Sequence, residues 1–385
     1  MADSPRIAND ADWFAARRWQ ETPLYARCPA AIADAMAALA ELVTSAWYRE
    51  QLLAVQAAPH PLALALTYPH YITIWPAIAV GLSLARVGAI PDFLRRRLLH
   101  REEFPGAASE LSAAAALTTH NVAFDWYPVE GGEFRVHEDP VRYIEVKRPQ
   151  YSSSLASLEV AQYMQITAEV CAASPTPHIS LNLKPNLLDA HTLRQRAEFD
   201  WGRLRVEALD AVRDVVRAGE LPAMRQLQFG TLWMARSREE LVSVGGGGFG
   251  GLYFKESHEH ERVIRATVKK ALRQLPAGQP VLVVLDWSAA SNEFARSLAE
   301  YLENARVGRS AAGVMVRRAT FVPGDYVPSQ KTWMVANPRD PTILGSSRAA
   351  AAVAVDPFAH LRASQEKAEE QRIIPTVSEA NDADG

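Results

Sequence analysis

The sequence predicts an α/β protein, because segments with a helical spacing of apolar residues alternate with short segments of strand-like pattern. Residues 104–119 are Ala-rich and form a strong helix candidate. "VAFDWYP" (122–128) alternates as a strand does, and "PVLVVLDWS" (280–288) is a continuous apolar run typical of a buried strand. With 385 residues the chain is long enough for a sizeable core and for two or three structural units.

The bulk composition is that of a soluble globular protein, with 48% apolar and 22% charged residues. The formal charge of −3 gives no global signal for nucleic acid, although net charge says little about a local groove. Two distant cysteines, Cys28 and Cys171, have no zinc-like or disulfide-like spacing. Their number favours a reducing, cytoplasmic location.

Residues 1–103 are expected to form a helical N-terminal region. Its polar, acidic start is unlike a signal peptide. Residues 51–85 contain no charged residue, but four prolines divide them into pieces too short to cross a bilayer, so we expect no membrane contact. The region carries no catalytic constellation. We expect it to support the rest of the chain, to join copies into a homo-oligomer, or to contact a partner.

The central segment, 104–190, has the element order α-β-β-β-α-β. The predicted elements are a helix at 104–119, strands at 122–128, 133–139 and 141–149, a helix at 154–173 and a strand at 178–185. Asp139-Pro140 is a plausible turn between the second and third strands.

The remaining segment, 191–345, is expected to form an additional C-terminal β-α-β half. Its predicted elements are helices at 191–219, 260–275 and 291–305, and strands at 224–237, 251–257, 280–288, 312–322 and 331–338. From 346 to 385 the chain becomes Ala-rich and then charged, which predicts a flexible tail or a loosely attached helix.

One predicted strand, "YIEVKRP" (143–149), contains the main candidates for catalytic residues. The strand period of two places Glu145 and Lys147 on the same face of an otherwise apolar segment. A carboxylate there can bind Mg²⁺ or Mn²⁺, and the ammonium can stabilise charge on a phosphoryl group or position water. A metal needs a second acid, for which Glu133 and Asp125 on the preceding strands are both candidates.

The segment 104–185 resembles the PD-(D/E)XK nuclease superfamily, whose core has the same α-β-β-β-α-β order. The matching motifs are "IEVK" for Glu145 and Lys147, and "ASEL" for a helix acid, Glu110. The resemblance places Glu133 where the family has an Asp, which is a departure, and leaves Asp125 as the alternative. It implies a restriction-endonuclease-like core and a metal site with Glu110 as an accessory ligand.

Other polar residues near the motif are candidates for substrate binding. Arg148 and Gln150 flank the motif and could contact phosphate oxygens, or could simply be exposed strand-end residues. Gln162 on the following helix matches a position that some family members direct at the site, although a solvated Gln is the plainer reading. Asp286 ends an apolar strand, where α/β proteins often place functional residues.

The expected function is therefore Mg²⁺- or Mn²⁺-dependent hydrolysis of a phosphodiester in nucleic acid, with DNA favoured over RNA. Restriction, repair and phage defence are equally compatible with a bacterial chain of this kind. Two alternatives stay open. One is a non-catalytic scaffold that keeps the fold and binds nucleic acid or protein. The other is a solvated strand face on which Glu145 and Lys147 merely pair with neighbours.

Overall fold

The computed structural model describes most of the chain between residues 28 and 361. The described ranges are 28–53, 60–67, 71–137, 139–148, 154–176, 178–183, 200–237, 240–241, 258–276, 278–286, 311–320, 327–337, 342–356 and 358–359, with the single residues 25, 298, 300 and 361. Outside them lie the predicted strand at 251–257, most of the predicted helix at 291–305, and Gln150. The predicted α/β class is confirmed as a mixture of helices with a six-stranded and a three-stranded sheet.

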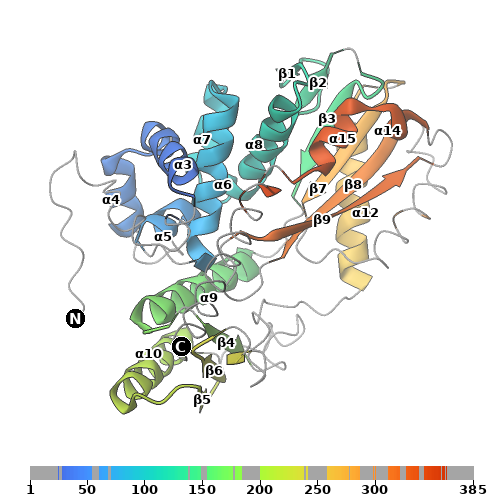
Figure 1. Ribbon diagram of the computed structural model, residues 1–385. Helices are drawn as coiled ribbons and strands as arrows, with labels where there is room; N and C mark the ends of the chain where they lie inside the picture. Colours follow the sequence, from blue (N-terminus) through green and yellow to red (C-terminus); the bar gives the residue numbers. More distant parts are fainter. Residues whose placement is uncertain are drawn as a thin grey trace, which may run out of the picture.

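The larger sheet has the strand order β1-β2-β3-β7-β8-β9 (Figure 1). Its strands are β1 (Phe124–Trp126), β2 (Phe134–Val136), β3 (Tyr143–Lys147), β7 (Val281–Asp286), β8 (Ala311–Thr320) and β9 (Ser329–Ala336). The first three strands are antiparallel, β3, β7 and β8 are parallel, and β9 is antiparallel to β8. The central strands β3 and β7 are almost wholly buried, because parallel strands are covered on both faces.

Strand β7, the parallel neighbour of β3, comes from far along the chain. Strand β4 (Ile179–Leu183), which the α-β-β-β-α-β order suggested for this place, lies instead in a second sheet of order β4-β6-β5, with β5 (Ala223–Gln226) and β6 (Gly230–Met234). Helix α12 (His258–Arg273) leads into β7 and packs against both β3 and β7. The C-terminal strands therefore complete the sheet begun by β1–β3 rather than forming a separate half.

Both faces of the larger sheet are covered by helices. One apolar cluster joins Ile144 and Val146 of β3 to helix α8 (Phe104–Thr119) and to the C-terminal helices α14 (Thr342–Ser346) and α15 (Arg348–Ala354). A second cluster joins Tyr143 to α12 on the other face. Figure 1 shows α8 and α15 on one side of the strands and α12 on the other. Alternating side chains of β3 thus enter two different cores.

A third apolar cluster joins the N-terminal helices to the second sheet. Its helices are α3 (Pro29–Leu42), α5 (Pro61–Thr67), α6 (Tyr71–Val87), α7 (Asp92–Leu99), α9 (Ser154–Ala173) and α10 (Trp201–Ala218), and α4 (Ser45–Leu53) packs on α5. Within the described residues no single helix is long and apolar enough to span a membrane; α3 and the start of α4 pass that test only as a pair bent by 85°. The predicted homo-oligomer stays a prediction.

Several predicted elements have the observed bounds. Helices α8 and α9 begin and end where the spacing of apolar residues places them, at 104–119 and 154–173. The segment 224–237 is one strand in the prediction but two antiparallel strands, β5 and β6, in the structure. Gly230 at the start of β6 allows β4 to approach closely, because a Cβ there would lie 2.5 Å from the carbonyl oxygen of Asn182 on β4.

The tail predicted from residue 346 is wrong in its first part. Helix α15 is buried, with Ala349 and Val353 fully inaccessible, because small side chains let it lie close to α8 and the sheet. Ser347 caps the helix by accepting a hydrogen bond from the Ala350 N–H. Buried Asp139, in the turn predicted between β2 and β3, accepts hydrogen bonds from the Ser347 hydroxyl and the Ala349 N–H.

Replacing Asp139 by Ala should destabilise the protein more than replacing Asp200, an exposed carboxylate that caps α10. The first change leaves buried donors unpaired and should lower the free energy of unfolding by about 3 kcal/mol. The second removes an exposed cap and should cost about 1 kcal/mol. Urea unfolding of Asp139→Ala and Asp200→Ala measures both, and equal losses would mean that Asp139 does not anchor the C-terminal helix.

Candidate functional site: a buried carboxylate pair with a lysine

The strand β3 and the register of its neighbour bring Glu133 to Glu145. Phe134 pairs with Ile144 and Arg135 with Tyr143, so Glu133, the residue before β2, lies beside the second half of β3, where the Val146 N–H donates to its carboxylate. The Glu133 N–H donates to the Ile144 carbonyl at 3.1 Å, which fixes this register at the start of β2. Of the two acids proposed from sequence as partners of Glu145, the structure places Glu133 beside it.

Lys147 connects the two carboxylates. Its ammonium donates to Glu133 Oε1 at 3.0 Å and forms an ion pair with Glu145 Oε1. The other oxygen of Glu133, Oε2, accepts the backbone N–H of Val146 at 2.7 Å. The side chains of Glu133 and Glu145 are only 10% and 3% exposed, whereas Lys147 is 25% exposed. Two acids and one amine are thus held together at the end of β3.

The hairpin between β1 and β2 positions Glu133. Gly131 and Gly132 both have positive φ, which glycine adopts without steric cost. A Cβ on Gly131 would also lie 2.2 Å from the carbonyl oxygen of Gln274, so the hairpin packs against the end of α12 in a way that no other residue allows. The Tyr127 N–H donates to the Glu133 carbonyl at 2.9 Å and closes the hairpin.

Burial and crowding change the acidity of these groups. Burial, together with the charge and hydrogen bond of Glu145, raises the pKa of Glu133 from 4.5 to about 8. Burial disfavours the charged form of Lys147, but the carboxylates of Glu133 and Glu145 outweigh this and raise its pKa. Lys147 is therefore a cation and a hydrogen-bond donor at neutral pH, whereas Glu133 is largely protonated there. Ionising both acids would leave one negative charge that Lys147 does not balance.

A pocket of about 340 Å³ opens beside this cluster. Its wall includes Glu133, Lys147 and Arg148 from the strand side, and Arg97 and Glu110 from α7 and α8. Glu110, proposed as an accessory ligand, is 3% exposed and forms two hydrogen bonds of 2.7 Å with the Arg97 guanidinium. Glu110 thus reaches the pocket but is already bound to a cation.

Arg97 and Tyr127 are site residues that the sequence analysis did not identify. The Tyr127 hydroxyl donates to Glu110 Oε2 at 2.7 Å, and Arg97 also pairs with Glu103 at 3.2 Å. Burial raises the pKa of Glu110 although Arg97 opposes this shift. The arginine run at 95–97 was visible as charge, but nothing in the sequence indicated that α7 lies against α8.

Asp125 belongs to a different cluster. It lies exposed on β1, where it accepts hydrogen bonds from Arg135 at 2.6 and 3.0 Å and bonds to His137 at 2.9 Å. These bonds, with His137 first, lower the pKa of Asp125. Among the described residues no interaction connects Asp125 with Glu145 or Lys147, so the structure does not bring it to the metal site proposed from sequence.

Of the residues predicted to bind substrate, Arg148 lies beside the cluster and Gln162 does not. Arg148 is exposed and lies in the pocket wall. Gln162 is exposed on α9, a helix that packs against α10 and α6, and no described interaction joins it to the cluster. Asp286, at the end of β7, is paired with the buried Arg317 of β8 through two hydrogen bonds of 2.5 and 2.7 Å.

The carboxylates of Glu133 and Glu145 provide some, but not all, of the ligands that a hard divalent cation requires. In the part of the chain that the structure describes, no group of three His, Cys, Asp or Glu side chains is arranged to hold a metal. Mg²⁺, however, commonly uses one or two carboxylates and keeps several waters. A cation between Glu133 and Glu145 would stabilise the ionised form of Glu133, whose pKa is raised by burial and by the charge of Glu145.

The raised pKa of Glu133 predicts how stability depends on pH. Between pH 4.5 and 8 this carboxyl is ionised in the unfolded chain but protonated in the folded one, so folding takes up a proton. Stability from this group is complete below pH 4.5 and is lost as pH rises through 8, by at most about 1.4 kcal/mol per pH unit. Urea unfolding from pH 5 to 9 should show wild type falling relative to Glu133→Gln. Parallel curves would mean that folding does not raise the pKa of Glu133.

Comparisons of this chain with models of protein families, with curated proteins and with solved structures found no match. The function of the cluster is therefore inferred from its own geometry: two buried carboxylates that face each other across an antiparallel strand pair, an ammonium that bridges them, and an adjoining pocket with Arg97 and Arg148 in its wall.

Proposed function

We propose that this protein is a divalent-metal-dependent phosphodiester hydrolase, a nuclease whose substrate is DNA in the first place. The observation that carries the proposal is the cluster of Glu133, Glu145 and Lys147 at the end of β3. Two carboxylates in contact attract a cation, and an ammonium beside them can donate to a phosphoryl oxygen. The same three residues form the acid and E-x-K positions on which the resemblance to PD-(D/E)XK nucleases rests.

Each residue has a distinct part in the proposed reaction. Glu133 and Glu145 would hold Mg²⁺ or Mn²⁺, which when bound would lower the pKa of a water and neutralise phosphate charge. Lys147 stays protonated, because both acids raise its pKa, so it would act as a donor to the phosphate or the attacking water rather than as a base. Arg148 would contact a neighbouring phosphate oxygen from the exposed end of β3.

Glu110 would act differently from the accessory ligand suggested by the resemblance. Its two oxygens are occupied by Arg97 and by the Tyr127 hydroxyl. It would therefore hold Arg97 at the pocket wall, and the guanidinium, which is 20% exposed, would meet the substrate. Arginine suits this role because its planar donors match the oxygens of a phosphate.

The topology supports the proposal once the inserted sheet is set aside. Helix α8, strands β1, β2 and β3, helix α12 and strand β7 follow one another in the order α-β-β-β-α-β, with β3 and β7 adjacent and parallel. The order that led to the resemblance can thus be built within one sheet, with residues 148–257 as an insertion. In this reading α12 and β7 replace the helix 154–173 and the strand 178–185 as the last two elements of the core.

A second function, a non-catalytic scaffold that binds nucleic acid or protein, is favoured by one observation. Lys147 already pairs with both acids, and Arg97 with Glu110, so the charges are partly balanced without a metal. In that case the cluster would only fasten β2 to β3. The two functions differ in whether a divalent cation binds the cluster and whether DNA is then cut.

A nicking assay tests the proposed chemistry. Supercoiled plasmid incubated with the protein and Mg²⁺ or Mn²⁺ should be nicked, and chelation with EDTA should stop the reaction. Glu145→Gln and Lys147→Ala should each lower the rate by about 100-fold or more, since each removes a group that would stabilise the transition state.

The matched control is Glu169→Gln, which removes another buried, Arg-paired carboxylate, on α9 away from the cluster. It should nick at the wild-type rate if it is folded. Equal nicking by wild type, Glu145→Gln and Lys147→Ala would show that the activity comes from elsewhere, and a complete lack of nicking with both metals would favour the scaffold.

Metal binding can be followed without turnover through thermal stability. A cation that binds only the folded protein stabilises it by mass action, by about 2.7 kcal/mol at a hundred times its Kd. Adding Mg²⁺ or Mn²⁺ should therefore raise the Tm of wild type and of Glu169→Gln, but not that of Glu145→Gln. The shift should grow as pH rises towards and beyond 8, because Glu133 then ionises. An unchanged Tm in wild type would exclude a metal at this cluster.

A further inference from the structure

A second hollow, of opposite chemistry, lies near the other end of β3. It has a volume of about 400 Å³ and is lined by Arg135, Val136, His137, Arg142, Tyr143 and Gln279. Five of these six side chains can donate hydrogen bonds and none is a carboxylate. The pocket beside Lys147 instead contains four glutamates in its wall. A hollow lined by donors is suited to an anion.

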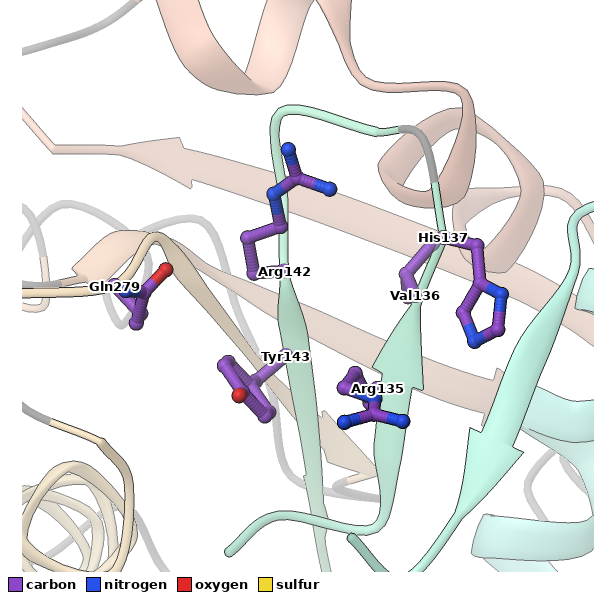
Figure 2. Close-up of a pocket in the computed structure, with 6 residues that line it drawn as sticks. All are labelled: Arg135, Val136, His137, Arg142, Tyr143 and Gln279. Atoms are coloured by element: carbon purple, nitrogen blue, oxygen red, sulfur yellow. The ribbon is translucent and has the colours of Figure 1, made fainter. Parts of the chain in front are cut away.

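Figure 2 shows how the donors surround this hollow. Tyr143, the first residue of β3, and Arg142 directly before it lie between Gln279 on one side and, on the other, Arg135 of β2 and His137 directly after β2. Arg142 is exposed, and its guanidinium makes no hydrogen bond or ion pair within the described part of the chain. A guanidinium with unused donors at the rim is available to an incoming oxyanion.

The cluster around Asp125 explains why Arg135 and His137 stand at this place. Asp125 binds the Nε and Nη2 of Arg135 and the Nε2 of His137, so it fixes both side chains on the β2 side of the hollow. Its negative charge balances part of theirs, and Glu130 lies 3.6 Å from Arg135 Nη1. Arg142 therefore supplies the cationic donor that no described acid already holds.

The position of the hollow relates it to the proposed cleavage site. Tyr143 and Lys147 are the two ends of β3 and share one face of the strand, so they are about 13 Å apart. A phosphate advances about 3.4 Å per base step along one strand of a B-form duplex. This is the rise along the helix axis; because the strand also winds around that axis, neighbouring phosphates are farther apart than this rise. A phosphate in this hollow would thus be fewer than four base steps from the bond positioned at Lys147.

We propose that the hollow at Arg142 is an anion subsite that binds a backbone phosphate of the nucleic acid fewer than four base steps from the cleaved bond. The inference deepens the proposed function and rests on it for the identity of the ligand. Contacts of this kind fix the register of a protein on a duplex without reading its sequence. Arg142 would therefore contribute affinity and position, and would take no part in the chemical step.

Binding measured without cleavage tests the subsite. The full-length Glu145→Gln chain, with Mg²⁺ and a fluorescent 20-base-pair duplex, gives Kd by anisotropy over a series of KCl concentrations. Adding Arg142→Ala should weaken binding by about 10-fold and reduce the slope of log K against log[KCl] by about 0.9, the value of one phosphate contact. Adding Arg217→Ala, an exposed arginine on α10, should change neither quantity.

Two further arms separate the possible outcomes. Ending the duplex at the bond positioned at Lys147, with no base pair on the side of the subsite, should abolish the effect of Arg142→Ala. If Arg142→Ala weakens binding of inorganic phosphate but not of the duplex, or if it behaves like Arg217→Ala while wild type still nicks plasmid, the subsite is wrong and the proposed function stands. If no form binds or nicks DNA, the proposed function fails as well.

Discussion

The repulsion between two buried carboxylates, Glu133 and Glu145, is the constraint on which the candidate site depends. Burying ionised acids is costly unless they are paired, and Lys147 supplies only one positive charge for the two. Burial first, and then the charge of Glu145, raise the pKa of Glu133 to about 8. If these positions contributed only to stability, well-packed apolar residues there would give an equal or higher free energy of unfolding. A charged cluster beside a pocket is what the proposed cation and anionic substrate would require.

The larger sheet supplies the rigidity that such a cluster needs. Strand β3 lies between β2, which Glu133 directly precedes, and β7, which pairs with it in parallel from Tyr143 to Lys147. Because β7 pairs with β3 over that whole length, and β2 with its first residues, the backbone at Glu145 and Lys147 is held in one geometry. Helix α8 packs its alanines against the same strand and thereby brings Glu110 to the pocket. Small side chains on α8 allow this close approach.

The sequence pattern predicted those parts of the site that depend on the conformation of a single strand or helix. The strand period alone set Glu145 and Lys147 on one face, and the spacing of apolar residues gave the ends of α8 and α9. The choice between Glu133 and Asp125 depended on the register of β2 against β3, which the positive-φ glycines of the hairpin help to fix. The contact of Arg97 with Glu110 joins two helices, and the pairing of β3 with β7 joins residues more than 130 positions apart. Periodicity carries no information about such distant partners, and for the same reason the buried helix α15 was expected to be a loose tail.

A crystal structure of the protein grown with Mn²⁺, with its anomalous signal, would test the central claim most directly. The account predicts one Mn²⁺ peak at about 2.2 Å from oxygens of both Glu133 and Glu145, with the Lys147 ammonium displaced towards the pocket. Carboxylate oxygens that remain bonded to Lys147, with no anomalous peak between them at saturating Mn²⁺, would contradict it. The cluster would then be an ion-paired fastening between β2 and β3.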